Sequence, residues 1–242
     1  MYKLLTVGGN PKLIKGDKIQ DKYLNAVMHF RPISSKICPF QIKAGCKEAC
    51  LNTAGRGGIF KKGENTNRIQ DARQRRTDMF LNDYDNFMAL LIIEITKFSN
   101  YCYKKDRMPC VRLNGTSDIQ WEYKIHNEKN IFEHFPNVQF YDYTKIPTRK
   151  TAHIKNYHLT WSYSEANKSY SDWFDKIAHN IAVVFSGEMP LLFKGLKVIS
   201  GDTHDMRFLD EPNVVIGLKA KGKAKKDLSG FVIHNNNIIA TS

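Results

Sequence analysis

Three cysteines, Cys38, Cys46 and Cys50, fall within thirteen residues in a segment with the spacing C-x7-C-x3-C. Thiolates are soft ligands that suit iron–sulfur clusters and zinc. A structural zinc site usually has four protein ligands and often contains C-x2-C pairs, which this segment lacks. Three cysteines can hold a [4Fe-4S] cluster and leave one iron open to a substrate or cofactor. We therefore expect a cluster here, with zinc and uncoordinated or transiently oxidised thiols as the alternatives.

Side chains suited to acid–base chemistry follow two other apolar runs. Asp202, His204 and Asp205 end the run LKVISGDTHD, where two carboxylates flank an imidazole. Such a group can act as an acid–base pair, a metal site or a ribose ligand. Lys145 ends VQFYDYTK, where an amine beside a carboxylate can orient a polar substrate or move protons. We treat these four residues as catalytic candidates, with solvated turns and ordinary surface residues as the alternative.

Other polar residues at the ends of such runs are candidates for binding a cofactor. Asp118 has a competing interpretation as a helix cap, and the aromatic beside Ser162 could equally be a core residue. Lys219 opens a row of lysines that could hold phosphates, or that could protect an exposed edge strand from aggregation. The expected cofactor-binding residues are Asn114, Asp118, Asp142, Ser162 and Lys219.

The elements that must position these residues alternate between apolar runs and connecting segments. Leu24–Phe30 predicts a first buried strand, followed by a cysteine-bearing loop at about 36–60. Residues 66–103 have helical periodicity with a break near Asn82. Six further strand-like runs follow, starting near residues 110, 138, 157, 181, 196 and 214. Helices are expected between the early runs, over 119–135 and 169–180.

Strands that alternate with helices predict a parallel sheet with both faces covered. We expect an α/β fold in a single domain over residues 1–242, forming a partial or open (β/α) barrel; a doubly wound α/β sheet is the alternative. In both architectures ligands bind beyond the carboxyl ends of the strands. The cysteine loop and every polar cluster follow such an end, so the chemistry is predicted to gather on one edge of the sheet.

The composition limits the partners. The chain has 242 residues and a net charge of +13, which favours nucleic acid, a nucleotide-like cofactor or an acidic host protein as partner, unless the charge serves solubility alone. The first residues are too polar for a signal peptide, and no run approaches the roughly 18 apolar residues of a membrane span. We expect a protein of the reducing cytoplasm, without membrane contact, in which clustered cysteines bind metal or do chemistry.

Six ordered blocks carry a resemblance: CPFQIKAGCKEACLNTAGRGGIF, VRLNGTSDIQWE, VQFYDYTK, NYHLTWSYSE, GDTHDMRFLD and GLKAKGKAKKDLSGFVI. Together they resemble a family of phage and prophage proteins that carries a gene-product label. The resemblance runs from about Leu4 to Ile233. It implies a phage origin and groups the blocks at one site, and it implies no reaction.

The placement of the cysteines after the first strand is similar to the architecture of radical S-adenosylmethionine enzymes, whose unique iron binds the amino-acid part of that cofactor. Their usual C-x3-C-x2-C spacing is absent here. The leading expectation is a phage-encoded iron–sulfur protein, with S-adenosylmethionine as a candidate cofactor and a small molecule or nucleotide at the open iron. The alternative is a nucleic-acid-binding or host-interaction protein with a structural metal site.

Overall fold

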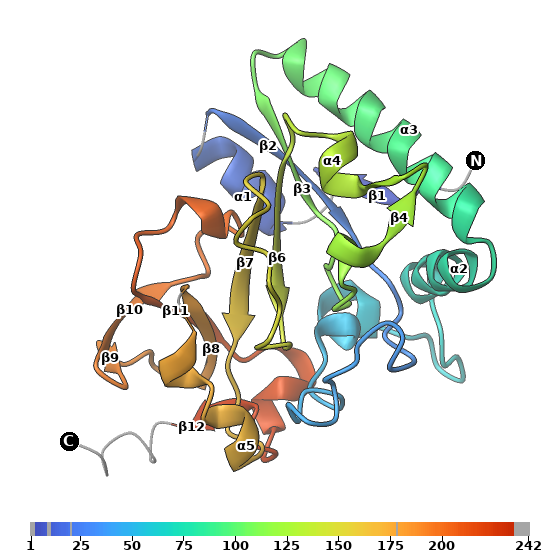
Figure 1. The fold of residues 1–242 in the computed structure, drawn as a ribbon. Helices are drawn as coiled ribbons and strands as arrows, with labels where there is room; N and C mark the ends of the chain where they lie inside the picture. Colours follow the sequence, from blue (N-terminus) through green and yellow to red (C-terminus); the bar gives the residue numbers. More distant parts are fainter. Residues whose placement is uncertain (1–2, 9–10, 20, 178, 235–242) are drawn as a thin grey trace.

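A computed structural model of the chain describes residues 3–8, 11–19, 21–177 and 179–234. Within these residues, ten strands form one sheet and two short strands form a separate hairpin. Figure 1 shows helices and long loops on both sides of the main sheet. The protein therefore has a mixed α/β fold built on one main sheet. The ends of the expected single domain, residues 1–2 and 235–242, lie outside the described residues.

Most strands of the main sheet run parallel. The strands are β1 (Leu5–Val7), β2 (Tyr23–Met28), β3 (Met108–Arg112), β6 (Gln139–Thr144), β7 (Tyr157–Ser162), β8 (Ile181–Ser186), β9 (Leu192–Phe193), β10 (Leu196–Ser200), β11 (Val215–Lys219) and β12 (Val232–His234). Their order is β1-β2-β3-β6-β7-β8-β11-β10-β9, and β12 pairs with the second half of β8. Only the edge pairs, β1 with β2 and β9 with β10, are antiparallel among the described strands of this sheet.

Three of the five described helices begin at asparagine caps. The helices are α1 (Pro11–Ile19), α2 (Arg68–Asn82), α3 (Tyr84–Tyr103), α4 (Ile131–His134) and α5 (Lys168–Ser171), and the capped ones are α2, α4 and α5. The Asn67 side chain caps α2 by accepting hydrogen bonds from the backbone N–H groups of Ile69 and Gln70, both at 3.0 Å. The expected helical stretch over 66–103 is confirmed as α2 and α3, with the break at Asp83. All seven expected strands of the sheet are also confirmed.

The two faces of the sheet have different covers. On the first face, Ala26 and Val111 pack in one buried apolar cluster with Leu91 and Ile95 of α3. The alternate residues point to the second face, where Cys110 and Tyr141 share a buried cluster with Met206 of the 201–210 segment. Helix α1 also lies on this second face, because Asp17 accepts hydrogen bonds from the backbone and side chain of Asn25. Side-chain alternation along each strand thus separates two environments.

Several connections differ from the expected helices. Residues 119–135 contain a short 3-10 turn, the hairpin of β4 (Ile125–His126) and β5 (Lys129–Asn130), and only one turn of helix in α4. Asn127 and Glu128 have φ values of 50° and 63°, as the tight turn of a hairpin requires, so a long helix here was a wrong prediction. Residues 169–180 likewise form only α5 and a 3-10 turn at Phe174–Lys176.

The sheet is open. At one end, the order of the strands in the sheet differs from their order along the chain. β11 lies between β8 and β10, and β1 and β9 are the free edges, so the described strands close no barrel. The sequence analysis did not predict β1 or α1. None of the helices that the structure describes is long and apolar enough to cross a membrane.

Candidate metal centre

The cysteine loop lies across the carboxyl edge of the parallel sheet. It begins directly after β2, and hydrogen bonds tie its backbone to segments that follow other strands. The Ile37 carbonyl accepts from the backbone N–H of Asp118 at 2.9 Å, beyond β3. The Ala44 carbonyl accepts from the Ser164 hydroxyl at 2.7 Å, and the Lys43 carbonyl accepts from the Asn167 side chain, both beyond β7. The fold therefore holds this irregular loop in place through its own polar groups.

Gly45 makes the close approach of this loop possible. Its φ is +66°, and a Cβ at this position would lie 2.7 Å from both the Ala166 Cβ and the Ser229 Oγ. The Ser229 hydroxyl donates to the Gly45 carbonyl at 2.9 Å. Only glycine satisfies both the backbone conformation and the space here. The position between Cys38 and Cys46 is thus fixed by packing as well as by hydrogen bonds.

The charges of the three cysteine thiols affect pKa values within this trio. All three are free and partly buried. Burial raises the pKa of Cys38, and Asp118, Cys50 and Cys46 raise it further. Burial also raises the pKa of Cys46 and of Cys50, and Cys50 adds to the effect on Cys46. The pKa values of Cys38 and Cys46 therefore depend on other cysteines of the same loop.

Two cations lie beside this trio. Lys145 follows β6; burial lowers its pKa to about 8, while Cys46 and Asp118 oppose the shift. Its Nζ donates to the carbonyls of Ser162 and Tyr163 at 2.9 and 3.1 Å. Arg73 of α2 lowers the pKa of Cys50, and its guanidinium donates to the carbonyl of Asn52 at 2.5 Å. These charges partly offset the burial that disfavours the thiolates of Cys46 and Cys50, the form that binds metal.

A buried ion-pair network of Asp118, Glu122 and Arg149 lies next to the cysteine loop. The Asp118 carboxylate accepts from the Thr144 hydroxyl at 2.8 Å and from the backbone N–H of Lys145 at 2.7 Å. The Arg149 guanidinium lies 3.5 Å from Asp118 and makes two hydrogen bonds to Glu122. Asp118 thus links the cysteine loop to β6 while Arg149 offsets its charge.

Asn114 and Asp142 form a second internal network. Asp142 accepts from the Asn114 backbone N–H at 2.7 Å and from the Tyr157 hydroxyl at 3.1 Å. The Asn114 side chain accepts from Ser117 and from the Trp121 indole, at 2.8 and 3.2 Å. Burial raises the pKa of Asp142 to about 7. Asn114 and Asp142 were expected to bind a cofactor. Their hydrogen bonds instead stabilise the segment that follows β3.

The remaining expected site residues lie in other surroundings. Asp202 pairs with Lys221 at 2.8 Å, and Asp205 lies 3.4 Å from the Arg112 guanidinium. The His204 ring is 3.0 Å from Arg207. The Ser162 carbonyl, through Lys145, is part of the cysteine site, and Lys219 is exposed at the end of β11. The structure therefore brings together the cysteines, Asp118 and Lys145.

Several residues that build this site were missed by the sequence analysis. Arg73, Gln70, Ser164, Asn167 and Ser229 anchor the cysteine loop through the contacts of its backbone. Arg73 and Gln70 stand in NTNRIQDARQRR, which reads as a basic helix surface. Residues three apart on a helix lie on the same side of it. This spacing was the one feature of the sequence that could have predicted that Gln70 and Arg73 act together.

The described residues contain no ready-made site for a single metal ion. In the described ranges, no group of three or more His, Cys, Asp or Glu side chains is arranged around one metal ion. A cluster makes a different demand, because each cysteine ligates a different iron and the thiols need not meet at one point.

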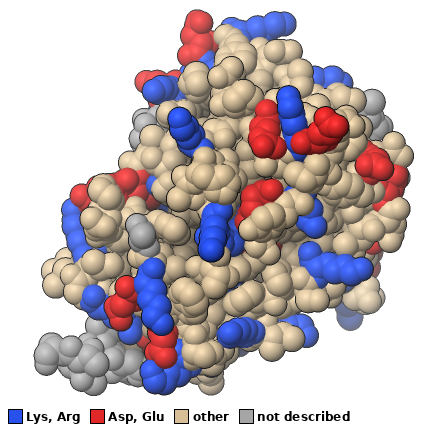
Figure 2. All heavy atoms as spheres, in the orientation of Figure 1, with Lys and Arg blue, Asp and Glu red and all other residues tan. Residues whose placement is uncertain are grey.

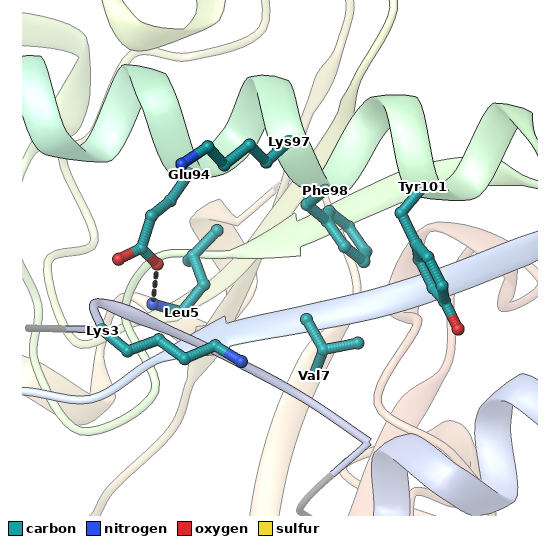
Figure 3. Close-up of a pocket in the computed structure, with 7 residues that line it drawn as sticks. All are labelled: Lys3, Leu5, Val7, Glu94, Lys97, Phe98 and Tyr101. Atoms are coloured by element: carbon teal, nitrogen blue, oxygen red, sulfur yellow. Dashed lines mark hydrogen bonds between the residues drawn. The ribbon is translucent and has the colours of Figure 1, made fainter. Parts of the chain in front are cut away.

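A separate pocket of about 510 Å³ lies between β1 and α3. Figure 3 shows its lining, with Phe98 and Tyr101 of α3 beside Val7, and Glu94 accepting a hydrogen bond from the Leu5 backbone. Glu94 also accepts from the Leu4 backbone at 2.8 Å. These hydrogen bonds of Glu94 hold the edge strand β1 against α3. The pocket therefore lies at the edge of the sheet, and no residue of the cysteine loop lines it.

Comparison with known proteins places the chain in a family. Residues 3–235 match the family described as Gene product 88. No curated protein and no solved structure matches the chain. Because the match spans nearly the whole chain, the protein belongs to the Gene product 88 family, a family of phage gene products.

Proposed function

We propose that this protein is an iron–sulfur protein in which Cys38, Cys46 and Cys50 hold a [4Fe-4S] cluster. The observation that carries the proposal is the shared environment of three free thiols, on a loop tied to the carboxyl edge of the sheet. A bound cluster would supply electron transfer and an open iron for a ligand. The candidates for that ligand are S-adenosylmethionine and a small molecule or nucleotide.

The chain's own residues would prepare the site in two ways. Lys145 and Arg73 would offset the negative charge that three thiolates bring into a half-buried environment. Asp118 would keep Lys145 beside Cys46, because it accepts the backbone N–H of Lys145. Strands β2, β3, β6, β7 and β8 neighbour one another in chain order, which supports an open (β/α) barrel similar to that of radical S-adenosylmethionine enzymes.

Iron and acid-labile sulfide in anaerobically purified protein test this proposal. We expect about four of each per chain by the stoichiometry of the cluster, and a broad absorption near about 400 nm. Cys38→Ser, Cys46→Ser and Cys50→Ser should each lose most of the iron. Cys102→Ala, on the buried side of α3, is the control and should keep it. Iron-free wild-type protein, or equal loss in the control, would contradict the proposal.

A second candidate function, nucleic-acid binding, is favoured by where the charge lies. Residues 31–67 contain seven Lys or Arg and two Glu, and residues 219–226 contain five Lys and no acidic residue. Each segment contributes +5, so together they supply ten of the thirteen net positive charges. Ala49 and Ala224 share a buried cluster, which joins the two segments into one basic rim around the cysteine loop. Figure 2 shows several Lys and Arg side chains along the lower part of the molecule, where Figure 1 places these segments.

Salt-dependent binding to single-stranded and duplex oligonucleotides tests this second candidate. Changing the exposed Lys219, Lys223 and Lys225 to Gln should reduce the slope of log K against log salt by about two to three. The matched control changes Lys104, Lys129 and Lys155 to Gln. These lysines are also exposed and lie outside both basic segments: Lys104 and Lys155 precede β3 and β7, and Lys129 begins β5. Undetectable binding, or equal effects of the two sets, would remove this candidate.

A further inference from the structure

A cluster of polar side chains lies on the second face of the sheet, away from the residues assigned to the metal centre. Pairing between β6 and β7 sets Tyr143 opposite Thr160 and Tyr141 opposite His158, so all four point to one face. Arg112 of β3 lies over the Tyr143 ring, with 4.8 Å between the guanidinium carbon and the ring centroid. Three neighbouring strands therefore contribute to one cluster.

The 201–210 segment completes this cluster from above. Arg207 is 1% exposed, and its Nε lies 3.3 Å from Asp210 Oδ2. Arg207 lowers the pKa of both Tyr143 and His158, which places its charge near both side chains. Asp205 lies 3.4 Å from Arg112. Each guanidinium thus has one carboxylate beside it, and the cluster is enclosed between the sheet and this segment.

Most of the unsatisfied polar atoms of the described chain gather here. Twelve buried side-chain nitrogen or oxygen atoms have no hydrogen-bond partner in the described part of the protein, and seven of them belong to this cluster. The seven atoms are Arg112 Nε, Tyr143 Oη, His158 Nε2, Thr160 Oγ1, Arg207 Nε, Arg207 Nη1 and Asp210 Oδ2; two of them, Arg207 Nε and Asp210 Oδ2, form an ion pair with each other at 3.3 Å, and the other five have no such contact. Buried polar groups are costly without partners, so a concentration of them indicates a binding site.

The unsatisfied atoms are mostly donors. The three guanidinium nitrogens can only donate, and the phenol and hydroxyl can donate as well. Burial raises the pKa of Tyr143, so its phenol keeps its proton at neutral pH. Among these atoms, Asp210 Oδ2 is the only one that can accept but not donate a hydrogen bond, and Arg207 already lies beside it. A ligand that satisfies this set must therefore supply several acceptor oxygens.

Further positive side chains lie toward the cysteine loop, beyond the two arginine–aspartate pairs of the cluster. His29 stands at the carboxyl end of β2, between the metal centre and this cluster. Burial lowers its pKa to about 3, and the charges of Arg73, Arg112 and Arg76 lower it further, against a smaller opposing effect of Asp205. Positive side chains thus extend from the cysteine loop toward Arg112.

We propose that Arg112, Tyr143, Thr160 and Arg207 form a binding site for a small molecule with an oxyanion group, a phosphate or a carboxylate. The guanidinium groups supply directed donors of the kind that pair with both groups. The site is independent of the cysteines, since none of its residues holds a thiol of the metal centre.

Calorimetric titration of the purified wild-type protein with inorganic phosphate and with succinate tests this site. Chloride holds the ionic strength constant and serves as the blank. We expect saturable binding of at least one oxyanion, and the one that binds more tightly distinguishes phosphate from carboxylate chemistry. Tyr143→Phe and Thr160→Val, which remove one hydroxyl each without changing side-chain size much, should weaken it about tenfold or more.

Urea unfolding separates binding from stability in the same variants. Because both hydroxyls lack a partner within the described part of the protein, their removal should leave the unfolding midpoint unchanged or higher. The control Tyr84→Phe removes a hydroxyl that donates to the Ile125 carbonyl at 3.1 Å, and it should bind the oxyanion as the wild type does. Absence of saturable binding, unchanged affinity in both variants, or a lower unfolding midpoint in both would overturn the proposal.

Discussion

Replacing Asp142 by Asn tests the electrostatics of the network beneath the cysteine loop. Asp142 is 1% exposed, and burial raises the pKa of its carboxyl to about 7, against hydrogen bonds from Asn114 and Tyr157. An aspartate in the unfolded chain titrates near about 3.9. The folded protein therefore holds a proton that the unfolded chain releases. The stability from this group is fully present below about pH 4 and is lost as the pH rises through about 7.

The size of this effect follows from the shift. A difference of about three pKa units corresponds to ~4 kcal/mol at the limit. Between pH 5 and pH 8, linkage predicts that the free energy of unfolding falls by about 2–3 kcal/mol through this carboxyl alone. The amide that replaces the carboxyl in the Asp142→Asn protein cannot ionise, so the variant lacks this component. Relative to the variant, the wild type should be more stable at pH 5 than at pH 8 by that amount.

Urea unfolding of both proteins, followed by tryptophan fluorescence at several pH values, measures this difference. Asp78→Asn is the control, because Asp78 is exposed on α2 and its carboxylate accepts from the Gln74 side chain. Its pH profile should stay parallel to that of the wild type. If the Asp142→Asn profile is also parallel, Asp142 is not protonated in the folded protein near neutral pH and the reasoning fails.

Two further substitutions near the cysteine loop, each with a control elsewhere in the chain, test how much the contacts there contribute to the free energy of unfolding. Gly45→Ala should lower the free energy of unfolding by roughly 2–5 kcal/mol, through its positive φ and its contacts; Gly63→Ala, with positive φ and open space, should cost ~1–2 kcal/mol. Equal costs in urea unfolding would refute the packing argument. Arg149→Met should cost about 3–5 kcal/mol by leaving two buried carboxylates unpaired, whereas Lys197→Met at an exposed pair should cost below about 1 kcal/mol. A small Arg149 effect would mean that the carboxylates take up protons instead.

The apolar runs of the sequence were enough to predict seven strands of the main sheet, whereas the short strands β1, β9 and β12 were missed. The clearest of these runs are rich in β-branched and aromatic residues and end in polar side chains, as in VQFYDYTK, which contains β6. The position of β11 between β8 and β10 could not be predicted, because no local signal encodes which strand pairs with which. The hairpin at residues 125–130 escaped prediction because its turn uses Asn127 and Glu128, not glycine.

The candidate sites were predictable to different degrees. The cysteines lie close in sequence, so the prediction of a common site depends on the path of only one loop. The role of Arg73 depends on which side of α2 packs against that loop, and neighbouring Arg75 and Arg76 look the same in the sequence. The cluster on the second face depends on strand register, since Tyr143 and Thr160 meet only because β6 and β7 pair as they do.

The anchoring of the cysteine loop predicts what metal removal will do. In small zinc modules the metal itself holds the ligand loop, and the apo forms are unfolded. Here the protein supplies other ties: Ser164 and Ser229 bind the carbonyls of Ala44 and Gly45, and Arg73 binds that of Asn52. Chelated protein should therefore keep its far-ultraviolet circular dichroism and a cooperative urea transition, with a lower midpoint from the lost binding energy.

This outcome separates a metal that does chemistry from one that only staples the loop. A chelated protein that loses its cooperative transition would show that the metal is structural, and the open iron would then have no part in the argument. A chelated protein that stays folded but can be reconstituted with iron and sulfide would place the cysteine loop among sites that the fold prepares in advance. The hydrogen bonds to Ala44, Gly45 and Asn52 require the second result, because none of them involves a thiol.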